Sequence, residues 1–389
     1  MKPQRIISSI ILIVSFAAIF GFGFWAGKTQ VVCRVCAPET VNFSLFWEAW
    51  NKVHDIYVNP ADFDTQKLIY GAISGIVKSL DDPYTVFFTP NQNKEFLEDV
   101  GGRFEGVGME IDIKDNQLQV VAPLEGTPAE RAGIRAGDKI LKIGDRSTTD
   151  ITVEEAVSLI RGKKGTEVTL QIFRKGWDAP KEIKIERDVI IVPSLKLEFK
   201  DDIAYLKLYQ FSENANSDFA KAAAQILNSS ANKIVLDLRN NPGGYLEVAQ
   251  SIAGWFLEKG QVVVIEDFRD EKNELVYKAS GNSSLLDYPI AVLINQGSAS
   301  ASEILAAALR DSRGIKLVGE TSFGKGSVQE LVTLTDGSSL KITVADWLTP
   351  KGEHIKKVGL KPDFEVKLTE EDAAGGKDPQ LEKAIEILK

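Results

Sequence analysis

The sequence predicts an α/β protein built from several domains. Its 389 residues exceed the length of one typical domain, and a prior of about 150 residues per domain gives two or three. Near-continuous apolar runs at residues 234–238 and 291–294 are typical of strands buried on both faces of a sheet. Helical apolar patterns follow both runs, at about Leu246 and Ile304. This alternation of strand and helix predicts the α/β class.

The composition is that of a globular protein, with 44% hydrophobic residues, 26% charged residues and a net charge of −9. The chain has no basic stripe, so nucleic acid is not expected as a partner. Its only cysteines are Cys33 and Cys36. Without a second pair or a nearby histidine they do not predict a zinc site. We interpret them as part of a juxtamembrane loop, in which a local or intermolecular disulfide is an alternative.

The first residues predict a membrane anchor. Residues 6–26 are apolar and uncharged, close to the ~20 residues that a bilayer span needs. A cleavable signal peptide is the alternative, but its apolar core has only ~7–15 residues. Lys2 and Arg5 before the run favour a cytoplasmic N-terminus, although Lys28 and Arg34 beyond it weaken that argument. We therefore expect an uncleaved signal anchor, with the rest of the chain on the extracytoplasmic side.

Residues 42–100 are predicted to be helical, with two apolar faces. The first face contains Phe46, Trp47, Trp50, Val53 and Tyr57, and the second contains Leu68, Ala72, Ile73, Ile76, Val77 and Leu80. We interpret both as packing surfaces and not as ligand sites. The second helix should end near Pro83, because the residue before a proline is biased away from the helical conformation.

Residues 104–188 have a different pattern, with short strand-like runs and two short predicted helices. The strands are expected at residues 108–113, 118–122, 139–143 and 168–173, and the helices at residues 128–132 and 153–159. The segments Gly106-Val107-Gly108-Met109 and Ala132-Gly-Ile-Arg-Ala-Gly-Asp138 resemble those of a PDZ domain. This resemblance implies that backbone N–H groups of Gly106 to Met109 bind a substrate's C-terminal carboxylate. A purely structural sheet domain is the alternative.

A serine-rich turn and a lysine loop carry the strongest chemical signal. Ser298, Ser300 and Ser302 lie between a predicted strand and a predicted helix, and Lys325 lies between two glycines after the next strand. This layout fits a serine nucleophile with a lysine base. The only histidines are His54 and His354, and no motif surrounds either of them. A Ser-His-Asp triad is therefore not favoured.

The segments GSASASE and GETSFGKGSVQ together resemble the carboxy-terminal processing peptidases, which are tail-specific serine proteases with a Ser-Lys pair. The likeness extends over about residues 42–389 and implies a crotonase-like catalytic domain of the tail-specific protease type. In this family the nucleophile lies twenty-five residues before the lysine, and a glutamine lies four residues after it. The resemblance therefore implies Ser300 as nucleophile, Lys325 as general base and Gln329 as the residue that orients the lysine.

A lysine can accept the serine proton only in its neutral form. Burial lowers the pKa of a lysine, and we expect Phe323 and Val328 to exclude water from Lys325. Gln329 can accept a hydrogen bond from the amine without adding the charge that would keep it protonated.

A double glycine follows the predicted strand at residues 234–238, in the segment Arg239-Asn-Asn-Pro-Gly-Gly244. Free backbone N–H groups between a strand and a helix make an anion site. The resemblance implies that Gly243 or Gly244 supplies one half of the oxyanion hole and that Ala301 supplies the other.

These observations divide the chain into four parts: an anchor with its juxtamembrane loop at residues 1–38, a helical region at 39–103, a PDZ domain at 104–188 and a catalytic domain at 189–389. Together with the predicted anchor, the resemblance implies a serine endopeptidase that cleaves extracytoplasmic proteins near their free C-termini. No metal or cofactor is implied. In this family the N-terminal helices often mediate dimers, so a homo-oligomer is expected.

Two other functions are less favoured. Residues 319–325 fit the first seven places of a P-loop, but the eighth place is Gly326 where a Ser or Thr should bind magnesium. A strand-like run also follows the loop, where a P-loop has a helix. The second alternative is a membrane-anchored PDZ scaffold on a resting or inactive protease core. The presence of Ser300, Lys325 and Gln329 favours peptidase activity.

Overall fold

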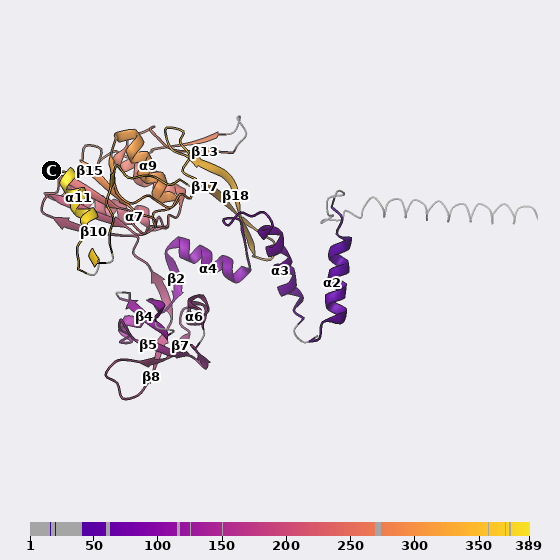
Figure 1. Cartoon of the computed structure of the whole chain (residues 1–389). Coiled ribbons are helices and arrows are strands. Elements are labelled where there is room, and N and C mark those ends of the chain that lie inside the picture. Colours follow the sequence, from indigo (N-terminus) through magenta and orange to yellow (C-terminus); the bar gives the residue numbers. More distant parts are fainter. Residues whose placement is uncertain are drawn as a thin grey trace, which may run out of the picture. The chain divides into compact units, whose positions relative to one another are not determined.

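The structure is a computed structural model of the chain (Figure 1). It describes residues 16, 20, 41–59, 63–114, 117–124, 126–149, 151–268, 274–356, 358–369, 371–372 and 375–389. The chain forms two compact units, Met1–Gly71 and Ala72–Lys389, which are described separately.

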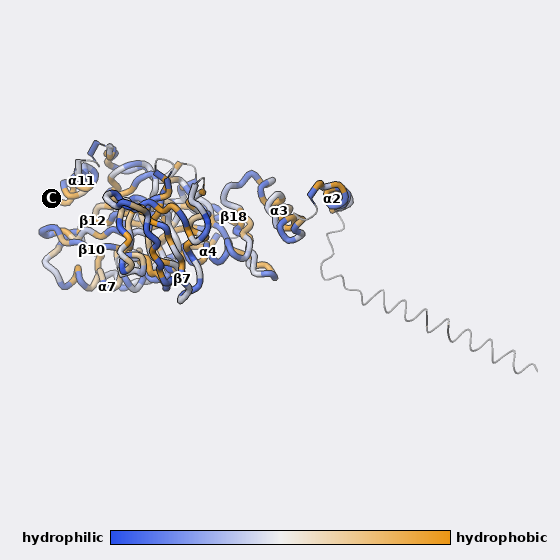
Figure 2. The backbone as a smooth tube through the Cα atoms, turned by 90° about the horizontal axis from the view of Figure 1, so that it is seen from below, coloured by the Kyte–Doolittle hydropathy of each residue, from blue (hydrophilic) through white to orange (hydrophobic). Residues whose placement is uncertain are grey.

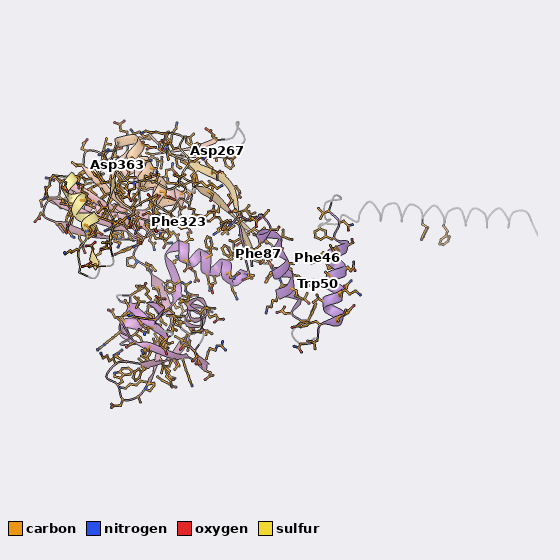
Figure 3. All side chains as sticks on the ribbon, viewed as in Figure 1. Phe46, Trp50, Phe87, Asp267, Phe323 and Asp363 are labelled. Carbon is orange, nitrogen blue, oxygen red and sulfur yellow. The ribbon has the colours of Figure 1, made fainter. Side chains whose placement is uncertain are left out.

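The first unit contains helix α2 (Ser44–Ile56) and the beginning of helix α3 (Thr65–Lys78). Trp50 packs edge-on against Phe63 with ring centroids 5.9 Å apart. The packing role expected of this face is only partly seen, because no residue of α2 is buried. Other apolar side chains of α2 face solvent, among them Leu45 and Trp47, which are 75% and 56% exposed. Figure 2 accordingly shows apolar colour along α2, and Figure 3 labels Phe46 and Trp50 on it.

The helices of the described residues are each too short or too polar to cross a membrane. The predicted anchor at residues 6–26 lies outside the described residues, except for Phe16 and Phe20. Cys33 and Cys36 also lie outside them.

The second unit contains a six-stranded catalytic sheet. Its strands, in spatial order, are β10 (Leu195–Lys200), β11 (Ile203–Leu208), β12 (Lys233–Asp237), β15 (Ile290–Ile294), β16 (Lys316–Gly319) and β19 (Phe364–Glu365). Strand β10 runs antiparallel to β11, and the remaining neighbours are parallel. The apolar runs therefore lie in the sheet centre, as the sequence predicted.

Helices cover both faces of this sheet. Helices α7 (Ala215–Leu227), α8 (Leu246–Phe256) and α9 (Ala301–Arg313) pack on the face formed by Leu236, Val292 and Leu317. Helix α11 (Pro379–Ile387) packs on the opposite face, formed by Val235, Leu293 and Val318. Successive strand residues point to opposite faces, so both faces must be apolar when both are covered.

A second sheet extends the catalytic part. It consists of β1 (Val86–Phe88), β13 (Val262–Asp267), β14 (Glu274–Lys278), β17 (Ser327–Thr333) and β18 (Ser339–Leu348). Strand β18 pairs with β1, β13 and β17, and Figure 1 shows β17 beside β18. The sequence predicted helix throughout residues 42–100, so β1 corrects that prediction. Its three residues, Val-Phe-Phe, favour a strand. Helix α4 (Pro90–Gly101) follows it, with Thr89 as N-cap.

Residues 109–186 form the small sheet that resembles a PDZ domain. Its strands are β3 (Met109–Lys114), β4 (Gln117–Pro123), β5 (Lys139–Ile143), β6 (Arg146–Ser147), β7 (Glu167–Phe173) and β8 (Lys181–Glu186). Its helices are α5 (Pro128–Arg131) and α6 (Val153–Ile160). Strand β3 lies at one edge of the sheet. A separate two-stranded ladder joins β2 (Arg103–Gly106) to β9 (Asp188–Ile191).

Candidate active site

Ser300 begins helix α9 in a strained conformation. Its φ of 54° and ψ of −116° lie outside the regions that residues other than glycine usually adopt. Strand β15 is fully buried and ends at Ile294, so the chain must turn within a few residues to start the helix. Strain of this kind persists only where the surrounding structure over-determines it, and it clusters at functional sites.

The three serines of the turn have different environments. Ser298 is buried and its hydroxyl donates to the Leu238 carbonyl at 2.8 Å. Ser302 is also buried, and its hydroxyl donates to the Asn241 carbonyl at 2.9 Å. Ser300 is only partly buried. The outer two serines therefore attach the turn to the segment after β12, and Ser300 is the serine that substrate could reach.

Lys325 lies on the loop between β16 and β17 and is partly buried. Burial lowers its pKa, the nearby positive charge of Lys341 lowers it further, and the Glu303 carboxylate opposes both effects. Its Nζ lies 5.7 Å from the centroid of the Tyr84 ring. Phe323, labelled in Figure 3, is 55% exposed, so the expectation that it covers the lysine was wrong. Tyr84, from a distant part of the sequence, lies against the amine instead.

Gln329 follows on β17. Its Nε2 donates to the Ser327 carbonyl at 3.0 Å and to the Ser327 hydroxyl at 2.8 Å. These bonds fix the amide orientation with respect to the strand that follows Lys325. The loop continues into β17 and not into a helix, which agrees with the rejection of a P-loop.

Glu303 joins the serine turn to the lysine loop, and the sequence analysis missed it. Its side chain is 1% exposed. One carboxylate oxygen accepts from the backbone N–H groups of Ser300 and Lys325, each at 3.0 Å. The other accepts from the Ser322 hydroxyl at 2.6 Å and the Gly324 N–H at 2.7 Å. Burial raises the pKa of Glu303 and these four donors oppose the rise.

A sequence signal for Glu303 did exist. A Ser at the N-cap with a Glu three residues later is the pattern of a capping box, in which the Glu accepts from the N-cap backbone N–H. Ser300 and Glu303 have this spacing and this bond. The additional bonds to Ser322, Gly324 and Lys325 depend on tertiary structure and could not be read from the spacing.

The Asn-Pro-Gly-Gly loop packs directly on the serine turn. A Cβ on Gly243, whose φ is 105°, would lie 2.8 Å from the Ser300 Cβ and 3.0 Å from the Ala301 nitrogen. A Cβ on Gly244, whose φ is 142°, would collide with the Phe211 backbone. Only glycine allows these approaches. Of the two glycines, Gly243 therefore faces the serine, and its N–H donates to the Asn241 side chain at 2.9 Å.

A buried ion network fixes the start of this loop. The Arg239 guanidinium bonds Asp237 at 2.7 Å and Asp378 at 2.8 Å, and it also donates to Gln380. Burial alone would lower the pKa of Arg239, but the bonds to Asp237 and Asp378 raise it. The Tyr205 hydroxyl donates to Asp237 at 2.6 Å. The first turn of α11 thus holds the loop that contacts Ser300.

The predicted carboxylate-binding segment leads into the edge strand β3. Val107 is 1% exposed, and its carbonyl accepts from the Ala129 N–H. The Gly108 carbonyl accepts from the Leu124 N–H at 3.0 Å and the Thr127 hydroxyl at 2.8 Å. The segment is thereby held against α5, with Met109 starting β3. An edge strand beside a fixed loop is the arrangement that peptide addition to a sheet requires.

Comparison with known families finds three matching regions in the chain. Residues 202–366 match peptidase family S41, residues 98–173 match the PDZ domain, and residues 33–91 match the N-terminal domain of the activating protease CtpB.

Similar proteins extend over nearly the whole chain. The carboxy-terminal processing protease CtpA of Bacillus subtilis is 38% identical over 370 residues, covering 95% of this chain and 78% of that protein. The carboxy-terminal-processing protease of Bartonella bacilliformis is 40% identical over 325 residues, covering 82% and 74%. The solved structure of the photosystem II D1 C-terminal processing protease has a TM-score of 0.51 and 29% identity, covering 83% of this chain and 92% of that one. A putative S41 protease from Bacteroides fragilis shares the fold, with a TM-score of 0.54 at 18% identity.

Proposed function

We propose that this chain, which belongs to peptidase family S41 and is a carboxy-terminal processing serine protease with a PDZ domain, cuts its substrates with Ser300 as nucleophile and Lys325 as general base. One observation carries the proposal: the buried carboxylate of Glu303 binds the backbone N–H groups of both residues at 3.0 Å. Two loops far apart in sequence are thus held together at these two positions.

The reaction begins when Lys325 Nζ, in its neutral form, takes the proton of the Ser300 hydroxyl. The serine oxygen then bonds to the scissile carbonyl carbon, and negative charge develops on the carbonyl oxygen. The Ala301 N–H, next to Ser300, is proposed as one donor to this charge, and Gly243 or Gly244 as the other. The Gly243 N–H donates to the Asn241 side chain in this structure, so it would have to leave that acceptor, whereas Gly244 would not. The C–N bond breaks as the lysine returns the proton to the leaving amine. Water then hydrolyses the acyl-enzyme by the same route.

Gln329 is proposed to orient Lys325. Its Nε2 is engaged by Ser327, so its remaining carbonyl oxygen is the atom suited to accept a hydrogen bond from the amine. A carboxylate at this position would instead favour the ammonium form. Gln329 is therefore a positioning residue.

The PDZ domain is proposed to select substrates by a free C-terminus. The substrate would add as a strand to β3, and its carboxylate would bind the backbone N–H groups of Gly106 to Met109. The fixed Val107 and Gly108 carbonyls support this. Amidation of a peptide's C-terminus removes the charge and should weaken its cleavage. Equal cleavage of amidated and free peptides would contradict this part of the proposal.

The location and assembly of the protein are also proposals. The uncharged run at residues 6–26, preceded by Lys2 and Arg5, supports a signal anchor with the protease extracytoplasmic. Solvent-facing Leu45 and Trp47 on α2 support a homo-oligomer formed through the N-terminal helices.

Substitution of the three turn serines tests the catalytic assignment. Ser300→Ala should abolish cleavage of an unfolded protein substrate, because the nucleophile is removed. Ser298→Ala and Ser302→Ala remove only buried structural bonds, so these variants should fold and retain substantial activity. Full activity of Ser300→Ala would overturn the assignment.

A further inference from the structure

A cavity of about 590 Å³ adjoins the loop that carries Lys325. Its apolar walls include Leu80, Pro83, Tyr84, Ile342, Val344 and Ala345. We propose that this cavity binds an apolar side chain of the substrate, from a residue within two positions of the scissile bond. This inference rests on the proposed function and adds a determinant of sequence preference to it.

The cavity is connected to the catalytic residues through Gly324. This residue lines the cavity, and its N–H donates to Glu303 at 2.7 Å. The same carboxylate accepts from the Ser300 N–H at 3.0 Å. The Glu303 carboxylate therefore bonds both a residue of the cavity wall and the backbone of Ser300, the proposed nucleophile.

Tyr84 makes a second connection. Tyr84 lines the cavity, and its ring centroid lies 5.7 Å from the Nζ of Lys325. Strand β18 makes a third, because its cavity-lining residues Ala345 and Asp346 pair with Val328 and Ser327, which closely follow the lysine. An extended peptide advances about 3.3 Å per residue. A side chain one or two residues from the bond at Ser300 can therefore reach this space.

The cavity wall is held in place by hydrogen bonds. The Asp82 carboxylate accepts from the Tyr84 N–H at 3.1 Å and from the Thr85 hydroxyl at 2.6 Å. The Thr85 hydroxyl oxygen in turn accepts from the Thr343 N–H on β18 at 3.1 Å. The segment that precedes β1 is thus fixed to strand β18, which also lines the cavity. A site that is formed before substrate arrives avoids the cost of ordering it.

The charges around the cavity determine which side chain fits. Lys356 is already paired with Asp346 at 2.6 Å. Asp81 and Asp82 also line the cavity, so an acidic substrate side chain would be repelled. Asp82 already accepts two hydrogen bonds and lies near the positive charges of Lys341 and Lys356. The geometry therefore favours a neutral apolar side chain such as Leu, Ile, Met or Phe over a basic one.

Cleavage-site profiling tests the proposal. The full-length protein is incubated with proteome-derived peptides that have free C-termini, and the cut positions are identified by mass spectrometry. We expect enrichment of large apolar residues at one position within two residues of the cut. Val344→Trp fills the cavity and should lower the Leu-to-Ala ratio of kcat/KM at that position by about tenfold, the scale at which apolar pockets discriminate. The control Val332→Trp, on β17 outside the cavity, should leave the ratio unchanged.

An unchanged Leu-to-Ala ratio in Val344→Trp, or enrichment of basic residues at that position, would overturn the proposal. A second measurement does not depend on cleavage. Peptides carrying photo-leucine are cross-linked to the Ser300→Ala protein, and attachment to residues 80–85 or 342–346 is expected. Attachment only elsewhere would overturn the cavity assignment even if Ser300 and Lys325 are catalytic. Conversely, cleavage by Ser300→Ala would refute the proposed nucleophile while leaving the cross-links to report on the cavity.

Discussion

The serine turn and the lysine loop meet at the same carboxylate, but the structure holds their side chains differently. On the serine side, buried hydroxyls of Ser298 and Ser302 tie the turn to the neighbouring loop, and Gly243 packs directly against Ser300. On the lysine side, Glu303 fixes the Lys325 backbone, while the Lys325 amine lies over the Tyr84 ring and the Gln329 amide nitrogen faces Ser327.

This difference indicates which of the two proposed catalytic residues depends more on the residues around it. The conformation of Ser300, the proposed nucleophile, is determined by its own turn, including the strained φ of 54°. The proposed base, Lys325, depends on its surroundings, because a lysine must lose its proton before it can accept one. The surroundings of Lys325, which include Tyr84, Lys341 and Glu303, therefore determine how readily it accepts a proton.

The largest effect is expected for Lys325→Arg. This change keeps the positive charge, but a guanidinium does not lose its proton in a protein. General-base catalysis contributes about 10²–10⁴-fold, so kcat should fall by that factor. Lys325→Ala should be equally inactive, with circular dichroism showing an intact fold in both variants. An active Lys325→Arg enzyme would mean that another group takes the proton, and His54 and His354 would then require testing.

Glu303→Gln should have the next largest effect, because an amide cannot accept at both ends as the carboxylate does. Two of the four donors at Ser300, Ser322, Gly324 and Lys325 would lose their acceptor. A hydrogen bond to a charged group contributes about 1.5–3 kcal/mol. We expect the equivalent of one such bond to be lost from the transition state, so kcat should fall about 10–100-fold. Glu330→Gln, at an exposed position of β17, is the matched control. Wild-type kcat in Glu303→Gln would show that this carboxylate does not position the pair.

Lys341→Met tests whether the charge of Lys341 helps to keep Lys325 neutral. The positive charge of Lys341 lowers the pKa of Lys325, so its removal should raise that pKa. The neutral amine is the active form, so the pH profile of kcat/KM should move to higher pH. Activity should fall several-fold at neutral pH and recover on the alkaline side. Lys221→Met, at an exposed position of α7, should not move the profile. A shift of the Lys341→Met profile to lower pH would contradict the account.

Gln329→Ala should have the smallest effect, because it removes orientation and not the proton acceptor. We expect kcat to fall less than about tenfold, the scale of one neutral hydrogen bond. KM should change little. A loss as large as that of Lys325→Ala would show that Gln329 has a direct part in the proton transfer.

Much of this architecture was predictable from local patterns. The apolar runs that became β12 and β15 are buried on both faces of the sheet, and the capping-box spacing of Ser300 and Glu303 was present in the sequence. The resemblances to the carboxy-terminal processing peptidases and to PDZ domains were confirmed by the comparisons. These features depend on residues close together in the chain. There, side-chain direction repeats about every two residues in a strand and about every 3.6 residues in a helix.

Most of the missed features depend on contacts distant in sequence. Strand β1 forms because Val86 pairs with Lys341, and Tyr84, which precedes it, thereby reaches Lys325. Phe323 and Val328 were expected to exclude water from the lysine because they are apolar, but Phe323 is 55% exposed and Val328 is only partly buried. The bond of Arg239 to Asp378 connects residues 139 positions apart. No local pattern indicates such pairs.

The central claim is that Lys325 is neutral when it acts, and an NMR titration tests it most directly. Lysine side chains are labelled at the ε-carbon, and the Lys325 signal is assigned by its absence from Lys325→Arg. Because burial lowers its pKa, Lys325 should titrate below the ordinary value for lysine, and kcat/KM of the unmodified protein should rise through the same pH range. If Lys325 instead titrates at or above the ordinary value of 10.5, or if activity rises in a different pH range, the lysine is not the base.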